Sequence, residues 1–124
     1  MGPMRGYSLY NFPSFDIMRD TLLASGIEVV SPADLDRDTG FDPLKMPAYW
    51  DWDALPCGFS LHEAAKRDLL ALMGCNAYVT LSGWEISNGA LAEKAVADWL
   101  GLRWLNRPLE QYEKDECASS ILAD

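Results

Sequence analysis

Residues 77–93 read Ala77-Tyr78-Val79-Thr80-Leu81-Ser82-Gly83-Trp84-Glu85-Ile86-Ser87-Asn88-Gly89-Ala90-Leu91-Ala92-Glu93. The first five residues have the composition of a β-strand, and residues 82–88 indicate a loop. A helix is predicted from about Gly89 to Leu100, with Gly101 as its end. In parallel α/β sheets, ligands bind in loops that lead from the end of a strand into a helix. The loop at 82–88 is therefore a candidate ligand site.

The segments on either side show the same alternation of helix and strand. Pro13 suits the first turn of a helix, and Ser60-Leu61-His62-Glu63 is a capping box that starts another. This alternation predicts one α/β domain over residues 1–124 with a short parallel sheet. The expected elements outside the quoted stretch are a helix from Asn11 to Gly26, a strand at 27–30, a helix from Ser60 to about Met73 and a strand at 102–105.

Residues 31–59 show no period and are predicted to form a long loop. They contain four prolines and the aromatic residues Tyr49, Trp50 and Trp52. Loops of this length are usually functional. The aromatic residues fit a lid that stacks on a base, a hydrophobic plug or a subunit contact, and the sequence leaves these readings open. Residues 106–124 form a polar tail.

Composition narrows the classes of function. The net charge of −9 argues against binding to a nucleic-acid polymer or an anionic membrane. No apolar run approaches the roughly 20 residues of a membrane span, and no signal peptide is recognisable. The three cysteines form no CxxC motif, so we expect a reducing cytoplasm and no zinc site. With His62 as the single histidine, a histidine-based triad or metal centre has little support.

One carboxylate stands where the helical pattern predicts an apolar residue. Leu61, Ala65, Asp68 and Leu72 are spaced four, three and four apart and share one helix face. A carboxylate that faces the interior must be paired or hydrogen-bonded. Spacing alone leaves two interpretations of Asp68 equal, as an interior carboxylate or as a residue at the rim.

A second carboxylate lies in the following helix. Glu93 follows Gly89 by four residues, and Gly89 leaves space for a ligand at the helix start. By spacing alone, an exposed Glu93 paired with Lys94 is the favoured interpretation. Two carboxylates at one pocket can divide nucleophilic and proton-transfer roles, as in glycoside hydrolysis.

Four stretches together resemble a known family. The chain resembles the nucleoside 2-deoxyribosyltransferase-like superfamily, and within it a DUF4406-type branch common in bacteriophages and bacteria. Deoxynucleoside 5′-monophosphate N-hydrolases are better-studied relatives. The resemblance spans roughly residues 2 to 105 and rests on Gly2-Pro3-Met4-Arg5-Gly6, on Tyr10-Asn11-Phe12-Pro13-Ser14-Phe15, on Arg67-Asp68-Leu69 with Cys75-Asn76-Ala77-Tyr78-Val79-Thr80-Leu81, and on residues 83–93.

The resemblance implies a Rossmann- or flavodoxin-like three-layer sandwich and cleavage of an N-glycosidic bond. It implies that Glu93 attacks C1′ of a 2-deoxyribosyl unit and that Asp68 holds the sugar or passes a proton to the base. Tyr7 is a candidate for holding the nucleophile, and Trp84 either lines the pocket or packs. A homodimer or larger assembly is expected, without metal or organic cofactor. The implied phosphate-binding residues are Gly2, Arg5, Gly6, Ser87 and Gly89.

The chain departs from its relatives at the N-terminus. They place a central strand before the Gly-Pro-Met loop, whereas only Met1 precedes Gly2 here, so the first strand is expected to be missing or truncated. The leading function is a deoxynucleoside 5′-monophosphate N-hydrolase, and the alternative is a base-exchanging nucleoside 2-deoxyribosyltransferase. A cytokinin-activating phosphoribohydrolase ranks lower, because its Pro-Gly-Gly-x-Gly-Thr signature is absent. A non-catalytic nucleotide-binding protein is the alternative from another class.

Overall fold

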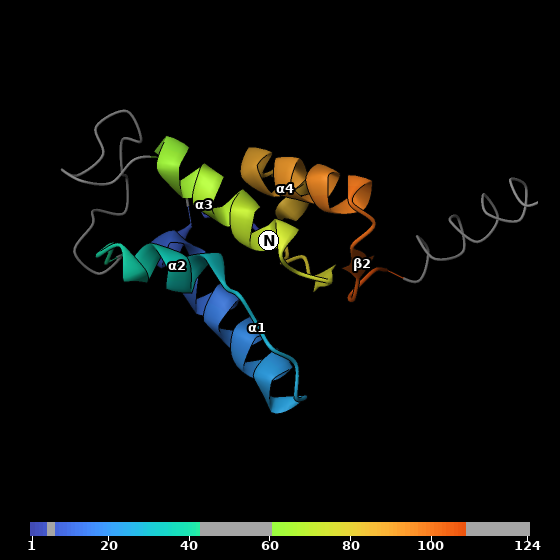
Figure 1. Ribbon diagram of the computed structural model, residues 1–124. Helices are drawn as coiled ribbons and strands as arrows, with labels where there is room; N and C mark the ends of the chain where they lie inside the picture. Colours follow the sequence, from blue (N-terminus) through green and yellow to red (C-terminus); the bar gives the residue numbers. More distant parts are fainter. Residues whose placement is uncertain (5–6, 43–60, 109–124) are drawn as a thin grey trace, which may run out of the picture.

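A computed structural model describes residues 1–4, 7–42 and 61–108 of the protein (Figure 1). Its two strands are parallel neighbours, and α2 packs against both α1 and α3, while α3 packs against α4. The elements are the 3₁₀ helix η1 (Ser8–Asn11), the helices α1 (Phe12–Ala24), α2 (Pro32–Asp38) and α3 (Leu61–Met73), the strand β1 (Ala77–Tyr78), the 3₁₀ helix η3 (Trp84–Ile86), the helix α4 (Asn88–Trp99) and the strand β2 (Arg103–Trp104).

The first helix confirms the boundaries expected from the sequence. Pro13 lies in the first turn of α1, and Gly26 follows its end with φ of +82°, a conformation that favours glycine. Asn11 occupies the N-cap position but makes no side-chain cap bond. Its Nδ2 instead donates to the Pro3 carbonyl oxygen at 2.8 Å. The residue expected to cap α1 therefore ties the N-terminal loop to the start of that helix.

The prediction of a structureless loop at 31–59 is wrong for its first part. Pro32–Asp38 form α2, with Ser31 at the N-cap position. Pro32 in the first turn preorganises the helix, while Asp34 near its start and Arg37 near its end suit the helix dipole. Residues 43–59 lie outside the described residues, and with them Tyr49, Trp50 and Trp52, for which a lid, a plug or a subunit contact was considered.

The sheet is shorter than expected. Ala77 pairs with Arg103 and Tyr78 with Trp104 in a parallel register, so the two strands predicted at 77–81 and 102–105 form with two residues each. The predicted strand at 27–30 is wrong, because this segment has no strand assignment. Residues 27–30 and β1 line the same cavity instead of pairing with each other. The fold is thus a mixed one of helices and a short parallel two-stranded sheet.

Met1 occupies the position beside β1 where the central strand was expected. Its amino nitrogen donates to the Val79 oxygen at 2.8 Å, and the Leu81 nitrogen donates to the Met1 oxygen at 2.8 Å. These two bonds follow the pattern of a parallel ladder. A Cβ on Gly2 would lie 2.6 Å from Leu81 Cβ, so the following residue must be small. One residue therefore makes the contacts of a neighbouring strand.

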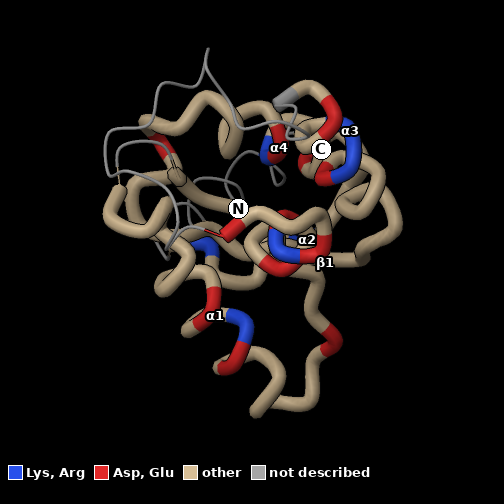
Figure 2. Tube along the Cα trace, turned by 90° about the vertical axis from the view of Figure 1, so that its left-hand side faces the viewer, with Lys and Arg blue, Asp and Glu red and all other residues tan. Residues whose placement is uncertain are grey.

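Two hydrophobic clusters support these elements. One joins α1 and α2 to the end of the β1 segment, and the other joins the sheet to α4. Ion pairs link α1 to α2: Arg19 pairs with Asp34, and Arg37 pairs with Asp16. Figure 2 shows basic residues of both helices beside acidic ones. The first cluster consists of Tyr10, Phe12, Phe15, Ala33, Phe41 and Leu81, and the second consists of Met1, Tyr78, Ala90, Ala97 and Trp104.

No helix in the described part of the chain is long and apolar enough to cross a membrane.

Candidate functional site

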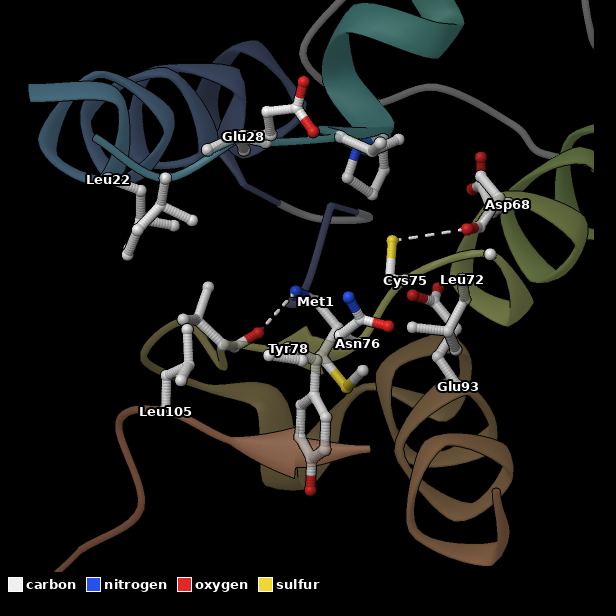
Figure 3. Close-up of a pocket in the computed structure, with 18 of the residues that line it drawn as sticks. Met1, Leu22, Glu28, Asp68, Leu72, Cys75, Asn76, Tyr78, Glu93 and Leu105 are labelled. Atoms are coloured by element: carbon white, nitrogen blue, oxygen red, sulfur yellow. Dashed lines mark hydrogen bonds between the residues drawn. The ribbon is translucent and has the colours of Figure 1, made fainter. Parts of the chain in front are cut away.

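A cavity of about 900 Å³ separates α1 and the segment after it from α3, β1 and α4 (Figure 3). Leu22, Ile27 and Val29 contribute to an apolar wall on one side. Asp68 of α3 and Glu93 of α4 line the opposite side. The two carboxylates that the sequence singled out therefore reach the same cavity from two different helices.

Asp68 is a largely buried carboxylate with a strongly shifted affinity for its proton. Its side chain is 16% exposed. Burial, followed by the negative charges of Asp36 and Glu93, raises the pKa of Asp68 to about 7, while Arg67 acts in the opposite direction. Of the two interpretations left open, the structure shows the interior one, facing a cavity. At this pKa the carboxyl can both give and take a proton near neutral pH.

The face of α3 differs in rotation from the predicted one. Ala64 is buried and Ala65 is exposed, the reverse of the expected stripe. Asp68 still faces the cavity together with Leu72, because both residues lie one and two turns beyond Ala64 on the same side.

Glu93 is half-buried and does not form the expected pair with Lys94. Lys94 Nζ binds Asp98 Oδ2 at 2.7 Å and lies 4.2 Å from the centre of the Trp104 ring. Burial raises the pKa of Glu93, the Met1 ammonium group lowers it, and Asp36 raises it. The interpretation of Glu93 as an exposed residue paired with Lys94 is therefore wrong.

The start of α4 is capped by Ser87, a residue that the resemblance had assigned to phosphate binding. Ser87 Oγ accepts a hydrogen bond from the Ala90 nitrogen at 3.2 Å, as a serine N-cap does. A Cβ on Gly89 would meet nothing within 4 Å, so the helix start is open, as expected. Ser87 and Gly89 do not line the cavity. Their geometry fixes the start of the helix that carries Glu93.

Sequence reasoning missed Asp36, a third carboxylate beside this site. Asp36 is 6% exposed and forms an ion pair with Arg67. Burial raises the pKa of Asp36, whereas Arg67 lowers it. The signal was the sequence Ser31-Pro32, in which a serine precedes a proline as at many helix starts, and Ala33 and Asp36, three residues apart, would then share one helix face. Assigning the region to a loop concealed it.

The other predicted site residues lie elsewhere or cannot be placed. Tyr7 lies against Gly83, and Trp84 packs edge-on against Trp104 at 5.6 Å, so neither lines the cavity, and neither does Gly2. Arg5 and Gly6, predicted to bind phosphate, are outside the described residues. Among residues 1–4, 7–42 and 61–108, no group of three or more His, Cys, Asp or Glu side chains could hold a metal ion.

Comparison with known proteins places the chain in one family. Neither a curated protein nor a solved structure matches it. The family described as domain of unknown function DUF4406 matches residues 1–105, which include β1, the cavity, Asp68 and Glu93. The chain therefore belongs to the DUF4406 family.

Proposed function

We propose that this protein is a hydrolase that cleaves the N-glycosidic bond of a 2′-deoxynucleoside 5′-monophosphate, with Glu93 as the nucleophile and Asp68 as the proton donor. One observation carries the proposal: two carboxylates from different helices line one cavity, and the pKa of one of them is raised to about 7. We also propose that the domain has a Rossmann-like three-layer scaffold. The two parallel strands and the helices are compatible with it.

The two carboxylates suit different steps of this reaction. The mechanism assigns the ionised form to Glu93, whose pKa the Met1 ammonium group lowers against the effect of burial, and the protonated form to Asp68, whose pKa is raised to about 7. Near neutral pH an ionised Glu93 can attack C1′ while Asp68 protonates the departing base. The bond from C1′ to the base breaks as the bond to Glu93 forms. Water, deprotonated by Asp68, then releases the sugar and restores both groups.

The shape of the cavity fits a nucleoside. Its volume of about 900 Å³ lies in the range of small-molecule sites. Leu22, Ile27 and Val29 contribute apolar surface on the side opposite Asp68 and Glu93, where Glu28 also lines the cavity. A base can be desolvated against such a wall while the sugar faces the charged side.

The charge of the cavity favours a second candidate, a 2-deoxyribosyltransferase acting on free nucleosides. Glu28 lines the cavity with Asp68 and Glu93, and no lysine or arginine side chain of the described residues does. Negative charge disfavours a phosphate unless Arg5 compensates for it. In the transferase, a second base instead of water attacks the sugar on Glu93.

The experiment is base release from a panel of 2′-deoxynucleosides and their 5′-monophosphates, followed by chromatography. We expect release from monophosphates by the wild type and a loss of at least about 100-fold in Glu93→Gln, because the amide cannot attack C1′. Glu85→Gln is the matched control, since Glu85 is an exposed glutamate of the preceding loop. Base exchange with free nucleosides would favour the transferase. Nucleotide binding without any release by the wild type would refute both enzymes and favour a non-catalytic binding protein.

A further inference from the structure

We propose that Asp36 is a positioning residue for Asp68: it holds the Arg67 guanidinium away from full contact with the Asp68 carboxyl, and so keeps Asp68 able to donate a proton. The inference rests on the proposed function for the use of that proton. The arrangement of the three side chains stands independently of it. Neither Asp36 nor Arg67 lines the cavity, so both act on the site through Asp68.

Arg67 is shared unequally between two carboxylates. Its Nη2 forms a close ion pair with Asp36 Oδ1 and lies 3.5 Å from Asp68 Oδ1, the limit of a hydrogen bond. Asp36 belongs to α2, whereas Arg67 and Asp68 are neighbours in α3. Because Asp36 is the more buried acid, it has the greater need of the cation. The contact between α2 and α3 therefore decides where the guanidinium points.

As a result, one donor atom and one acceptor atom are left without a hydrogen-bond partner. Arg67 Nε, a donor, and Asp68 Oδ1, an acceptor, are both buried and have no hydrogen-bond partner in the described part of the chain. An arginine that is free to turn would satisfy both by forming a two-pronged pair with the carboxylate. The fixed orientation toward Asp36 prevents this pairing. Asp68 is therefore poorly stabilised as an anion, which favours its protonated form.

Charged groups from several elements surround Asp68, and Glu28 of the segment after α1 lines the same cavity. Asp36 of α2 and Glu93 of α4 are negative, whereas Arg67 of its own helix and the Met1 ammonium group are positive. Replacing Asp36 by asparagine removes one repulsive charge and also releases Arg67 toward Asp68. Both changes stabilise the Asp68 anion and therefore lower the pKa of Asp68.

The test is a pH titration of the carboxyl groups by ¹³C NMR in aspartate-labelled protein, with Asp68→Asn assigning the signal. We expect the Asp68 midpoint to fall by at least about one pH unit in Asp36→Asn, a tenfold change in its protonation ratio. Asp36→Glu should restore the wild-type value, and Asp34→Asn, on the same helix, should not change it. Asp36→Ser provides a second neutral variant if Asp36→Asn does not fold. An unchanged or raised midpoint in the neutral variants would overturn the proposal.

A second measurement links this titration to chemistry. If Asp68 donates the proton, base release falls as pH rises through the pKa of Asp68. The same fall should therefore occur at a lower pH in Asp36→Asn, by the shift that NMR measures. A wild type that releases no base would refute the proposed function alone, because the NMR titration tests the role of Asp36 without any substrate. A shifted activity profile with an unshifted Asp68 signal would refute the role of Asp36.

Discussion

Burial of Asp68 predicts that the protein loses stability as pH rises toward neutrality. The folded pKa of Asp68 is about 7, against a value of 3.8 for an unburied aspartate, so the folded state holds a proton that the unfolded chain has released. The stabilising effect is complete below the unfolded value and is lost as pH rises through the folded one. From about pH 5 to about pH 8.5 the loss is about 2.7 kcal/mol, because each pH unit between the two pKa values contributes roughly 1.36 kcal/mol. Screening at the open side of the cavity reduces this to about 1.5 kcal/mol.

Asp68→Asn removes this effect, because the amide carries no titrating proton. Urea unfolding of both proteins at about pH 5 and about pH 8.5 measures it. We expect the wild type to lose about 1.5 kcal/mol more than Asp68→Asn between the two values. Comparing the change with pH cancels any fixed cost of burying the amide. Asp34→Asn, a substitution in an ion pair between α1 and α2, should follow the wild type. Equal pH dependence in wild type and Asp68→Asn would refute the burial argument.

Two further substitutions test how the scaffold around the site is held. Asn106→Ala should lower the free energy of unfolding by about 2 kcal/mol in urea titrations, because Asn106 bonds both backbone groups of Thr80 and the Trp104 indole; a loss below about 0.5 kcal/mol would contradict this. Gly83→Ala should cost about 1–3 kcal/mol, since φ is +88° and a Cβ would lie 2.5 Å from Tyr7 Oη. Adding Tyr7→Phe should recover part of that loss, and no recovery would mean that the hydroxyl makes no clash.

Helices α1, α3 and α4 were predictable because their signals are local, whereas α2 was missed. Pro13 in the first turn of α1 and Gly74 and Gly101 after α3 and α4 determine the backbone within a few residues, whatever lies around them. The boundaries in the structure accordingly agree with those expected to within one or two residues. Ser60, the first residue of the predicted capping box, lies outside the described residues.

The strands were less predictable because a strand depends on its neighbour. Residues 27–30 have the composition of a strand, but nothing in their own sequence supplies the partner that a ladder requires. The backbone of Met1 forms its hydrogen bonds with Val79 and Leu81 and not with residues 27–30. Residues 27–30 line the cavity and pair with neither strand of the described residues. The same dependence on tertiary contacts explains why β1 is shorter than the apolar run that predicts it.

The candidate site was also predictable only in part. Helical spacing identified Asp68 as unusual but could not distinguish a rim position from an interior one, because that choice depends on how α3 rotates against α2 and α4. Spacing gave the wrong partner for Glu93, since the rings of Tyr78, Trp84 and Trp104 attract Lys94 away from it. Aromatic contacts from three separate segments cannot be read from adjacent residues.

Stability and the proposed chemistry make opposite demands on this group of acids. A scaffold selected for stability alone would let Arg67 pair fully with Asp68, or would replace one of the acids with an apolar residue. In the structure, Asp36 instead forms the close ion pair with Arg67. Arg67 Nε and Asp68 Oδ1 are left without a hydrogen-bond partner among the described residues. Unpaired buried groups of this kind persist where function requires them. Asp68→Asn, which removes the loss of stability at high pH, is therefore expected also to abolish most of the base release.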